Sequence, residues 1–479
     1  MEKSRINILL SDIRFWILVA FLLRLYGITF SPLEVNHNWR QSTVNMVARN
    51  FFEISNNIFL PRIDFAGDLT GITGMEFPFF NYLIYLSSLI FGFDHWYGRL
   101  INLMISSLGI WYFYKLIKQL WNTKLAFSAS FILLFSHWFK YSRKIMPDTF
   151  AVSLVMIGLY FAFCYLQRKN QNILYLIGAT LLMPIGALAK LPAGYAYAFF
   201  IIPLINKQFE WKKKVYLFGG LTLGLLSVLF WYFYWSPYLT THYQFYHFFQ
   251  GKSLQSGFFD ILYEPKLFLK NFYEYPLHFV GFGLFALGIF SAIRADQKDV
   301  LTILSLGMVA YIPVILKGGW TFIHHSYYMV PVTPLMALIA GIGLNSIPNR
   351  YIFTLFCCAY LVDNGLSQMD DFKVRENYFS FENLEEDLNS LGVSATDLIV
   401  INSHPNPTPF YFSNRKGWLL SNDQIVNSQT LFEITKGKAK YLVVTKECFG
   451  SNISTTTKPI YSRDTYDIYN LSEFYPPKK

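Results

Sequence analysis

The sequence predicts a mainly α-helical protein that crosses a membrane many times and ends in a small α/β domain. Three observations support this fold class. Hydrophobic residues make up 53% of the 479-residue chain and charged residues only 15%, whereas a soluble domain has roughly 25% charged residues. Long apolar stretches recur up to about residue 366, and beyond it the composition becomes that of a soluble domain. The net charge of +10 fits the cationic loops of a membrane protein, so no nucleic-acid partner is predicted.

The apolar stretches are the candidate membrane spans. A helix needs about 20 mostly apolar residues to cross the hydrocarbon core of a bilayer. About eleven stretches approach this pattern: 13–31, 99–117, 125–141, 150–167, 172–189, 195–208, 215–235, 275–294, 300–317, 328–346 and 350–366. A further apolar stretch, 78–93, would reverse the orientation of every later span if it crossed the membrane.

Positive charges decide the orientation, because short cytoplasmic loops are enriched in Lys and Arg. If the N-terminus is cytoplasmic and 78–93 only re-enters the bilayer or lies along its outer face, nearly all short basic clusters are cytoplasmic. These clusters are Lys3, Arg5 and Arg14; Lys115, Lys118 and Lys124; Arg168 and Lys169; Lys207, Lys212, Lys213 and Lys214; Arg294 and Lys298; and Arg350. We therefore expect a membrane domain, 1–366, with a first outer loop at 32–98, an outer turn at 141–148 and a long outer loop at 236–274.

The C-terminal segment, 367–479, is predicted to be a small α/β domain on the same outer side. Its first part is polar and leads into a helix that stops at Gly392. The runs 397–403 and 439–445 are short, apolar and rich in β-branched residues, as buried strands are. Alternating helix and strand signals favour an α/β fold. We expect this domain to cover the membrane domain, to contact an acceptor, or to be a passive cap.

The first outer loop concentrates charged residues. It contains Glu34, His37, Arg40, Arg49, Arg62, Asp64, Asp68 and Glu76. Residues 40–49 are expected to form an amphipathic helix at the membrane interface, where the arginines could contact lipid head groups. Because the positive-inside bias disfavours arginines in outer loops, several of them in one acidic loop also suggest anion binding. Both interpretations stay open.

Two carboxylates stand at the predicted outer ends of apolar stretches. Glu76 precedes Pro78, and Asp148 follows Pro147. A carboxylate at membrane depth needs a cation, a metal or a proton. For Asp148 the simpler alternative is that it caps a helix N-terminus. If both acids are functional, they could converge on one pocket.

A third cluster, HHSYYMVPVTP, begins at the paired residues His324 and His325. An aromatic belt at the membrane interface would explain Tyr327 and Tyr328. The paired histidines are less typical of such a belt, and a metal or proton site is the alternative.

Taken in order, these motifs resemble those of membrane-embedded glycosyltransferases of the GT-C type, in particular the protein-mannosyltransferase and aminoarabinose-transferase-like group. The matching segments are WRQSTVNMVARNF, PRID, GMEFPFFNYL, YSRKIMPDTF and HHSYYMVPVTP, and the resemblance covers roughly residues 10–350. It implies an enzyme that takes a sugar from a polyprenyl-phosphate donor and passes it to a lipid, glycan or protein acceptor. It also implies a bacterial inner membrane, with the reaction on the outer face.

The resemblance transfers the family's residue roles unevenly. Glu76 matches an acid that helps to form a metal site near the carrier phosphate, but the lysine that follows that acid in the family is Phe77 here. Asp148 matches the family's acid in the second outer loop. The acidic pair that opens the first-loop helix in the family reads NHNWRQ here, and the nearest substitutes for its catalytic acid are Glu34 and His37.

The implied reaction needs three kinds of residue, and the candidates are grouped accordingly. Cations must stabilise the departing phosphate, and a base must take the proton of the acceptor; a single displacement would invert the anomeric configuration. The candidate catalytic residues are Glu34, His37, Asp64 and Asp148. The candidate phosphate and donor ligands are Arg40, Arg62, Arg143, Lys144 and Tyr328. The candidate ligands of a divalent metal are Glu76 and His325.

Three other functions are alternatives, and one of them, a structural or scaffold protein, would leave the outer acids and histidines unexplained. An outer-face ligase or polymerase would transfer a preassembled glycan from the same kind of carrier, and the loop 236–274 could supply its larger acceptor groove. A transporter of lipid-linked sugars would predict charges near the middle of spans and internal repeats. The charges here cluster at the predicted outer boundary and no internal repeat is seen, so transport is the less favoured alternative.

Overall fold

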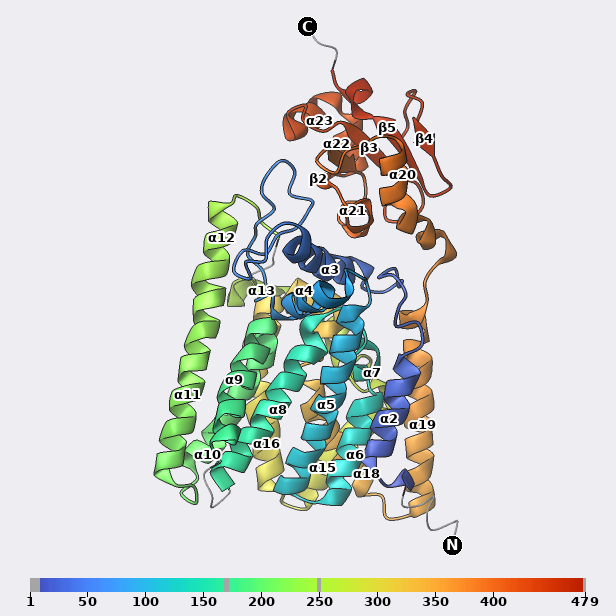
Figure 1. The fold of residues 1–479 in the computed structure, drawn as a ribbon. Helices are drawn as coiled ribbons and strands as arrows, with labels where there is room; N and C mark the ends of the chain where they lie inside the picture. The colour runs from blue at the N-terminus through green and yellow to red at the C-terminus, as the bar shows by residue number, and fades with distance from the viewer. Residues whose placement is uncertain (1–8, 168–171, 248–250, 477–479) are drawn as a thin grey trace. The chain divides into compact units, whose positions relative to one another are not determined.

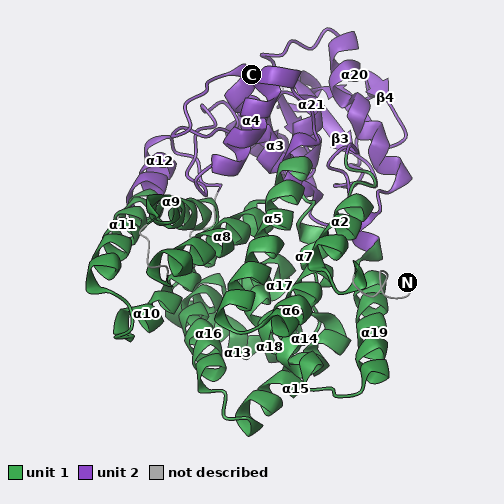
Figure 2. Cartoon of the chain, turned by 60° about the horizontal axis from the view of Figure 1, so that its bottom comes forward, with its two compact units in different colours: residues 1–28, 99–233, 249–369 green, residues 29–98, 234–248, 370–479 purple. Residues whose placement is uncertain are grey.

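The computed structural model describes residues 9–167, 172–247 and 251–476 and divides the chain into two compact units (Figure 2). Unit 1 comprises residues 1–28, 99–233 and 249–369, and unit 2 comprises residues 29–98, 234–248 and 370–479. The first outer loop therefore belongs to the same unit as the C-terminal segment. Four of the residues used above to orient the spans, Lys3, Arg5, Arg168 and Lys169, lie outside the described residues.

Unit 1 is a bundle of helices, several of which run side by side (Figure 1). The longer helices are α2 (Ile13–Arg24), α5 (Tyr97–Leu120), α6 (Thr123–Phe135), α8 (Pro147–Gln167), α9 (Ile173–Ala189), α11 (Trp211–Phe230), α15 (His278–Arg294), α16 (Lys298–Gly318), α18 (Thr333–Asn345) and α19 (Arg350–Gln368). Shorter elements connect them: α7 (Trp138–Tyr141), η1 (Leu191–Phe200), α10 (Ile201–Ile205), η2 (Trp231–Trp235), α13 (Leu254–Tyr263), α14 (Pro265–Tyr273), α17 (Trp320–His324) and η3 (Ser326–Met329). Side chains of Asp12, Asn122, Asn172 and Asn349 cap the first turns of α2, α6, α9 and α19.

Four helices are long and apolar enough to cross a membrane, or five if the bent pair α14 and α15 counts as one span. The chain is thus a multi-pass membrane protein, but the predicted count of about eleven spans is not confirmed. The reason is that several apolar stretches do not form one long helix. The stretch 125–141 breaks at Ser136 between α6 and α7, and 195–208 is 3₁₀ helix followed by a short α-helix.

Glycines bring α15 and α18 into close contact. A Cβ atom at Gly288 would lie 1.9 Å from the backbone oxygen of Ile339, and one at Gly343 would lie 2.1 Å from the backbone oxygen of Leu284. The segment GFGLFALG, at 281–288, is therefore a helix-packing surface.

Unit 2 combines the first loop with an α/β fold. The loop supplies α3 (Asn38–Glu53) and α4 (Phe79–Phe91), and the segment 234–248 supplies α12 (Ser236–His242). The C-terminal part contains η4 (Met369–Phe372), η5 (Glu376–Asn383), α20 (Leu384–Ser390), β1 (Leu398–Ile401), α21 (Thr408–Ser413), β2 (Lys416–Leu419), α22 (Asn422–Val426), α23 (Ser428–Thr435), β3 (Tyr441–Thr445), β4 (Tyr461–Ser462), β5 (Tyr466–Asn470) and η6 (Leu471–Phe474).

The five strands form one sheet in the order β2-β1-β3-β5-β4. Strand β1 pairs in parallel with β2 and β3, with Ile399 opposite Gly417 and Tyr441, while β5 is antiparallel to β3 and β4. The predicted α/β fold is confirmed, because the two apolar runs form β1 and β3. The predicted helix stop is also confirmed: Gly392 has φ +74° just beyond α20.

The first loop packs directly on this sheet. The backbone N–H of Gly67 donates to the oxygen of Gly417 at 2.6 Å, and the N–H of Gly417 donates to the oxygen of Asp64 at 3.1 Å. Met46, Val47 and Phe51 of α3 belong to the same core cluster as the strand residues Ile399 and Val443. The apolar side of α3 is thus buried in unit 2. The predicted helix exists, but its expected position against lipid is wrong, because the sheet domain covers its apolar side.

Candidate functional site

The sequence-predicted residues fall into two groups, one in each unit. Unit 2 contains Glu34, His37, Arg40, Arg62, Asp64 and Glu76, and unit 1 contains Arg143, Lys144, Asp148, His325 and Tyr328. Each group is described within its own unit.

The start of α3 holds the proposed substitutes for the missing family acid. Glu34 is buried, and its carboxylate accepts a hydrogen bond from Gln41 Nε2 at 2.7 Å. His37 occupies the N-cap of α3 in the left-handed region, at φ 67°. Asn38 Nδ2 donates to the backbone oxygen of Glu34 at 3.1 Å. This segment is thus held by local hydrogen bonds from the first turn of the helix.

The C-terminal part of unit 2 contributes to the same region. Asn38 Oδ1 accepts hydrogen bonds from Asn406 Nδ2 at 3.0 Å and from Thr408 Oγ1 at 3.3 Å. Glu34 also forms an isolated β-bridge with Val374. The C-terminal segment therefore contacts the residues at the start of α3.

Glu76 and Arg40 form a buried ion pair. This contact supplies the cation that a buried carboxylate needs. Within residues 9–167, 172–247 and 251–476, no group of three or more His, Cys, Asp or Glu side chains is placed to hold a metal ion. The divalent metal stays a prediction, and we derive no step of the reaction through it.

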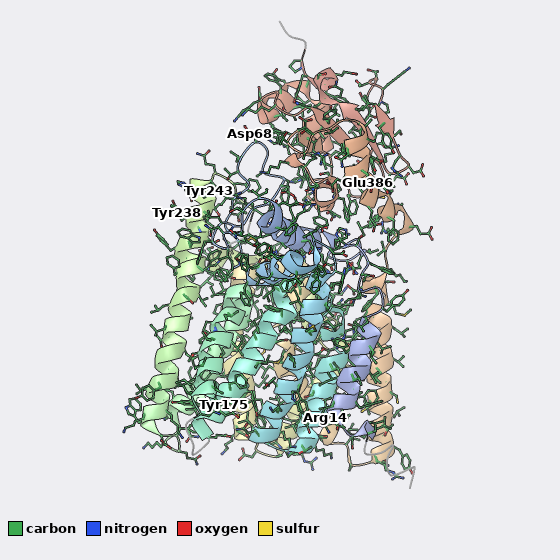
Figure 3. The ribbon with its side chains drawn as sticks, viewed as in Figure 1. Arg14, Asp68, Tyr175, Tyr238, Tyr243 and Glu386 are labelled. Atoms are coloured by element: carbon green, nitrogen blue, oxygen red, sulfur yellow. The ribbon has the colours of Figure 1, made fainter. Side chains whose placement is uncertain are left out.

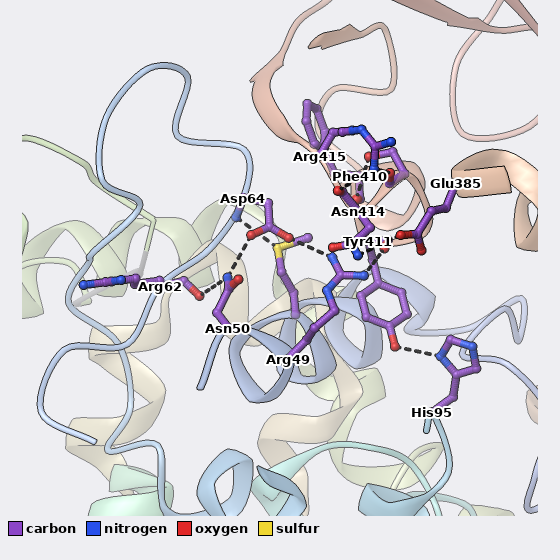
Figure 4. Close-up of polar contacts among 12 residues, drawn as sticks. Arg49, Asn50, Arg62, Asp64, His95, Glu385, Phe410, Tyr411, Asn414 and Arg415 are labelled. Atoms are coloured by element: carbon purple, nitrogen blue, oxygen red, sulfur yellow. Dashed lines mark hydrogen bonds and ion pairs between the residues drawn. The ribbon is translucent and has the colours of Figure 1, made fainter. Parts of the chain in front are cut away.

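Asp64 is the centre of a second buried network (Figure 4). Its carboxylate accepts a hydrogen bond from Arg49 Nη2 at 2.9 Å and another from Asn50 Nδ2 at 2.8 Å. Arg49 Nη1 also donates to the backbone oxygen of Tyr411 at 2.8 Å, and its guanidinium lies over the Tyr411 ring. Burial alone would lower the pKa of Arg49, but the charge of Asp64 holds it above the usual value. Asp64 thus has the contacts of a structural brace.

These ion pairs correct the lipid-contact interpretation of two loop arginines. Arg40 and Arg49 are both buried and both paired with carboxylates inside unit 2. Arg62 differs. Its side chain points away from Asp64 in Figure 4, and its guanidinium makes no hydrogen bond or ion pair within the part of the chain that the structure describes. Among the described residues, Arg62 thus differs from Arg40 and Arg49 in having no carboxylate partner.

Unit 1 contains a buried cation that the sequence analysis missed. Lys190 follows α9, its side chain is buried, and its Nζ lies 3.4 Å from Asp148 Oδ1. The same Nζ lies 5.2 Å and 5.8 Å from the ring centroids of Tyr327 and Tyr328. Asp148 is in the first turn of α8, as predicted. A signal for Lys190 exists in the sequence, because a lysine at the predicted outer end of a span runs against the positive-inside rule.

An apolar cavity lies next to this cluster within unit 1. Its lining comes from α5, α8, η1, α10, α16 and the start of α18, and includes Val152, Ala193, Tyr195 and Pro331. Val152 is one helical turn from Asp148, so both lie on the same face of α8. Ala193 is three residues beyond Lys190. The lining of the cavity thus includes residues a few positions along the chain from both Asp148 and Lys190.

The remaining predicted residues of unit 1 lie near the turn after α7. Arg143 and Lys144 are buried, and Arg143 Nη2 donates to the backbone oxygen of Gly27 at 2.8 Å. His325 separates α17 from η3, and its ring stacks on Tyr327. Through this stacking His325 contacts Tyr327, one of the two tyrosines that lie near Lys190.

The helix bundle with its small α/β sheet is similar to solved structures that have the GT-C fold. Residues 76–234 match the family model described as dolichyl-phosphate-mannose-protein mannosyltransferase. The resemblance of the chain to the GT-C glycosyltransferases is thereby confirmed.

Solved structures support the same fold. ArnT from Cupriavidus metallidurans, bound to undecaprenyl phosphate, is similar over 97% of this chain and 99% of its own, with a TM-score of 0.57 and 11% identity. The oligosaccharyltransferase of Archaeoglobus fulgidus is similar over 90% of this chain and 69% of its own, with a TM-score of 0.56 and 13% identity. The arabinofuranosyltransferase AftD from Mycobacteria is similar over 96% of this chain and 41% of its own, with a TM-score of 0.54 and 12% identity. A search of the curated proteins finds no match to the chain.

Proposed function

We propose that this protein transfers a sugar from a polyprenyl-phosphate donor to a lipid, glycan or protein acceptor. The proposal places the reaction on the outer face, as the charge pattern of the loops predicts, and in a bacterial inner membrane, as the resemblance to the GT-C family implies. It is supported by the GT-C fold and by the similarity to ArnT, whose structure contains undecaprenyl phosphate.

The observation that carries the proposal is the buried Lys190 ammonium beside the apolar cavity. A polyprenyl phosphate combines an anionic head with a long apolar chain. Within unit 1, a buried cation lies 3.4 Å from Asp148 and next to an apolar cavity. An ammonium in such a water-poor environment stabilises a developing phosphate charge strongly. In this proposal Lys190 supplies a cationic phosphate contact of the kind that the family's lysine provides, since this chain has Phe77 at that lysine's position.

The proposed reaction is a single displacement. The acceptor oxygen attacks the anomeric carbon, the bond from that carbon to the phosphate oxygen breaks, and the bonding electrons leave with the phosphate. Within unit 1, Lys190 stabilises the departing phosphate, and Tyr328, Arg143 and Lys144 are further candidate ligands. Within unit 2, Glu34 is the candidate base that takes the acceptor proton. Arg62 is the loop residue proposed to bind an anionic group of the donor.

The test is turnover of radiolabelled polyprenyl-phosphate sugars by the purified full-length protein in membranes. We expect sugar release or transfer in the wild type and at least a hundredfold loss in Lys190→Met and Glu34→Gln. Glu386→Gln is the matched control, because Glu386 is an exposed carboxylate of the same unit as Glu34 (Figure 3). Equal activity of Lys190→Met and wild type would contradict the proposed role of Lys190. Turnover only of a preassembled, carrier-linked glycan would favour the ligase alternative.

A further inference from the structure

Arg24, at the end of α2, is a buried cation to which the proposed mechanism gives no role. Its exposed fraction is 0%. Its Nε donates to the backbone oxygen of Ala20 at 2.8 Å, and its Nη1 donates to Ser142 Oγ. The guanidinium also lies 5.2 Å from the centroid of the Phe139 ring. Its Nη2 has no hydrogen-bond partner within the described residues.

The charges around Arg24 make this arrangement costly. Within the described part of the chain no carboxylate pairs with Arg24, and the charge that acts on it is the like charge of Arg143. A backbone oxygen, a hydroxyl and an aromatic ring offset only part of the cost of burying a guanidinium. The hydrogen bonds to Ala20 and Ser142 could be made by a neutral side chain. A positive charge that is kept buried in an apolar helix bundle without a counter-ion is a candidate functional residue.

The chemistry of the site selects an oxyanion. A guanidinium presents N–H groups in a planar fork that matches phosphate oxygens in pairs. Ser142 connects the two arginines, because it accepts from Arg24 and immediately precedes Arg143 in the turn after α7. Arg143 is itself held by the backbone oxygen of Gly27, three residues beyond Arg24. Within unit 1 the Arg24 guanidinium is thus held at the Ser142 hydroxyl, and the Arg143 guanidinium is held at the backbone oxygen of Gly27.

We propose that Arg24 and Arg143 form an anion site that binds a phosphate monoester, the group carried by a polyprenyl monophosphate. This deepens the proposed function, because it adds a second contact region for the phosphate of the carrier to the one around Lys190. The identity of the lipid rests on the proposed function. The binding of phosphate itself can be measured without any sugar transfer.

The experiment measures binding to the purified full-length protein in detergent, by the shift in apparent Tm and by direct titration. Three probes are compared: inorganic phosphate, a C55 polyprenyl monophosphate and phosphatidylglycerol. We expect the polyprenyl monophosphate to bind at least tenfold more weakly to Arg24→Gln and to Arg143→Gln than to the wild type. Arg24→Lys should retain part of the affinity, since it keeps the charge and loses the fork. Arg14→Gln is the control, because Arg14 lies on the same helix, is exposed and pairs with Asp12 at 2.5 Å (Figure 3).

Each outcome decides the proposal. A similar loss of affinity for inorganic phosphate supports recognition of the phosphate group itself, whereas a loss seen only with the polyprenyl probe supports a site that needs the lipid chain. Equal affinity of the wild type, Arg24→Gln and Arg143→Gln for both monoester probes would overturn it, as would equally tight binding of phosphatidylglycerol. If Arg24→Gln does not fold, Arg24→Lys and Arg143→Gln still give the comparison. Arg24-dependent binding without any sugar transfer would refute the proposed function and leave the anion site standing.

Discussion

Replacing Asp64 by Asn tests whether this residue braces unit 2 or takes part in the chemistry. The substitution keeps the size of the side chain and removes the charge that faces Arg49 at 2.9 Å. Arg49 and Asp64 are only 6% and 5% exposed, and breaking a buried ion pair costs about 3–5 kcal/mol. Arg49 keeps its bond to the Tyr411 oxygen and its contact with the ring. We therefore expect a loss near the lower limit, about 3 kcal/mol.

This loss is large enough to measure. For a domain of 150–250 residues, 1 kcal/mol corresponds to about 2–4 °C in Tm, so Asp64→Asn should lower the apparent Tm of unit 2 by about 6–12 °C. The double variant Arg49→Met with Asp64→Leu removes both charges and should be nearly as stable as the wild type. The transfer rate, measured well below the transition, should stay within about twofold of the wild type, since a brace is needed for folding and not for the chemical step.

Two results would refute this reasoning. An unchanged Tm in Asp64→Asn would mean that the ion pair contributes nothing to the folded unit. A normal Tm with a rate lowered by two or more orders of magnitude would return Asp64 to the catalytic role that the sequence suggests.

Three further predictions concern unit 2. Tyr411→Phe keeps the ring and loses the hydrogen bond between the hydroxyl and His95 Nδ1, at 2.7 Å, so thermal unfolding should show a loss of about 1 kcal/mol. Gly67 and Gly92 both have positive φ, but only at Gly67 would a new Cβ collide with a side chain, the indole of Trp418 at 2.4 Å. Gly67→Ala should therefore lower the Tm more than Gly92→Ala does. Equal Tm shifts in the two variants would contradict the collision. Burial, with a smaller contribution from a nearby arginine, lowers the pKa of His247 from 6.5 to about 4. Between these pH values the unfolded chain binds a proton at His247 and the folded chain does not. The free energy of unfolding should therefore fall as the pH drops from about 6.5 towards 4. A His247→Phe variant should show a weaker fall.

The parts of the fold that depend on neighbouring residues in the sequence could be predicted. The β-branched runs form β1 and β3, Gly392 ends a helix, and the Arg40–Arg49 segment is helical, because local composition and turn chemistry determine these features. The predicted count of about eleven spans is not confirmed. Hydropathy does not reveal that a helix ends at Ser136 or that the chain after Lys190 becomes 3₁₀ helix.

For the site residues, too, the sequence predicts local features but not contacts between residues that are far apart in the chain. The sequence predicts a concentration of charge in the first loop, but it does not show which charges meet. Arg40 pairs with Glu76 across 36 residues, and Arg49 contacts Tyr411 across 362 residues. Tyr411 carries no sequence signal, since it is one aromatic residue in a chain with 33 tyrosines. Only the packing of unit 2 gives it a role.

These ion pairs change which residues are expected to bind the phosphate of the donor. In the sequence, the arginines of the first loop are the natural candidates for phosphate binding. In the structure, Arg40 and Arg49 are neutralised inside unit 2, and each would have to give up a buried carboxylate in order to bind a ligand. Such an exchange is unfavourable, because the abandoned carboxylate would remain buried without a partner. The phosphate that we propose at Lys190 in unit 1 must likewise leave an ion pair in place, because the Lys190 Nζ lies 3.4 Å from the buried Asp148 carboxylate.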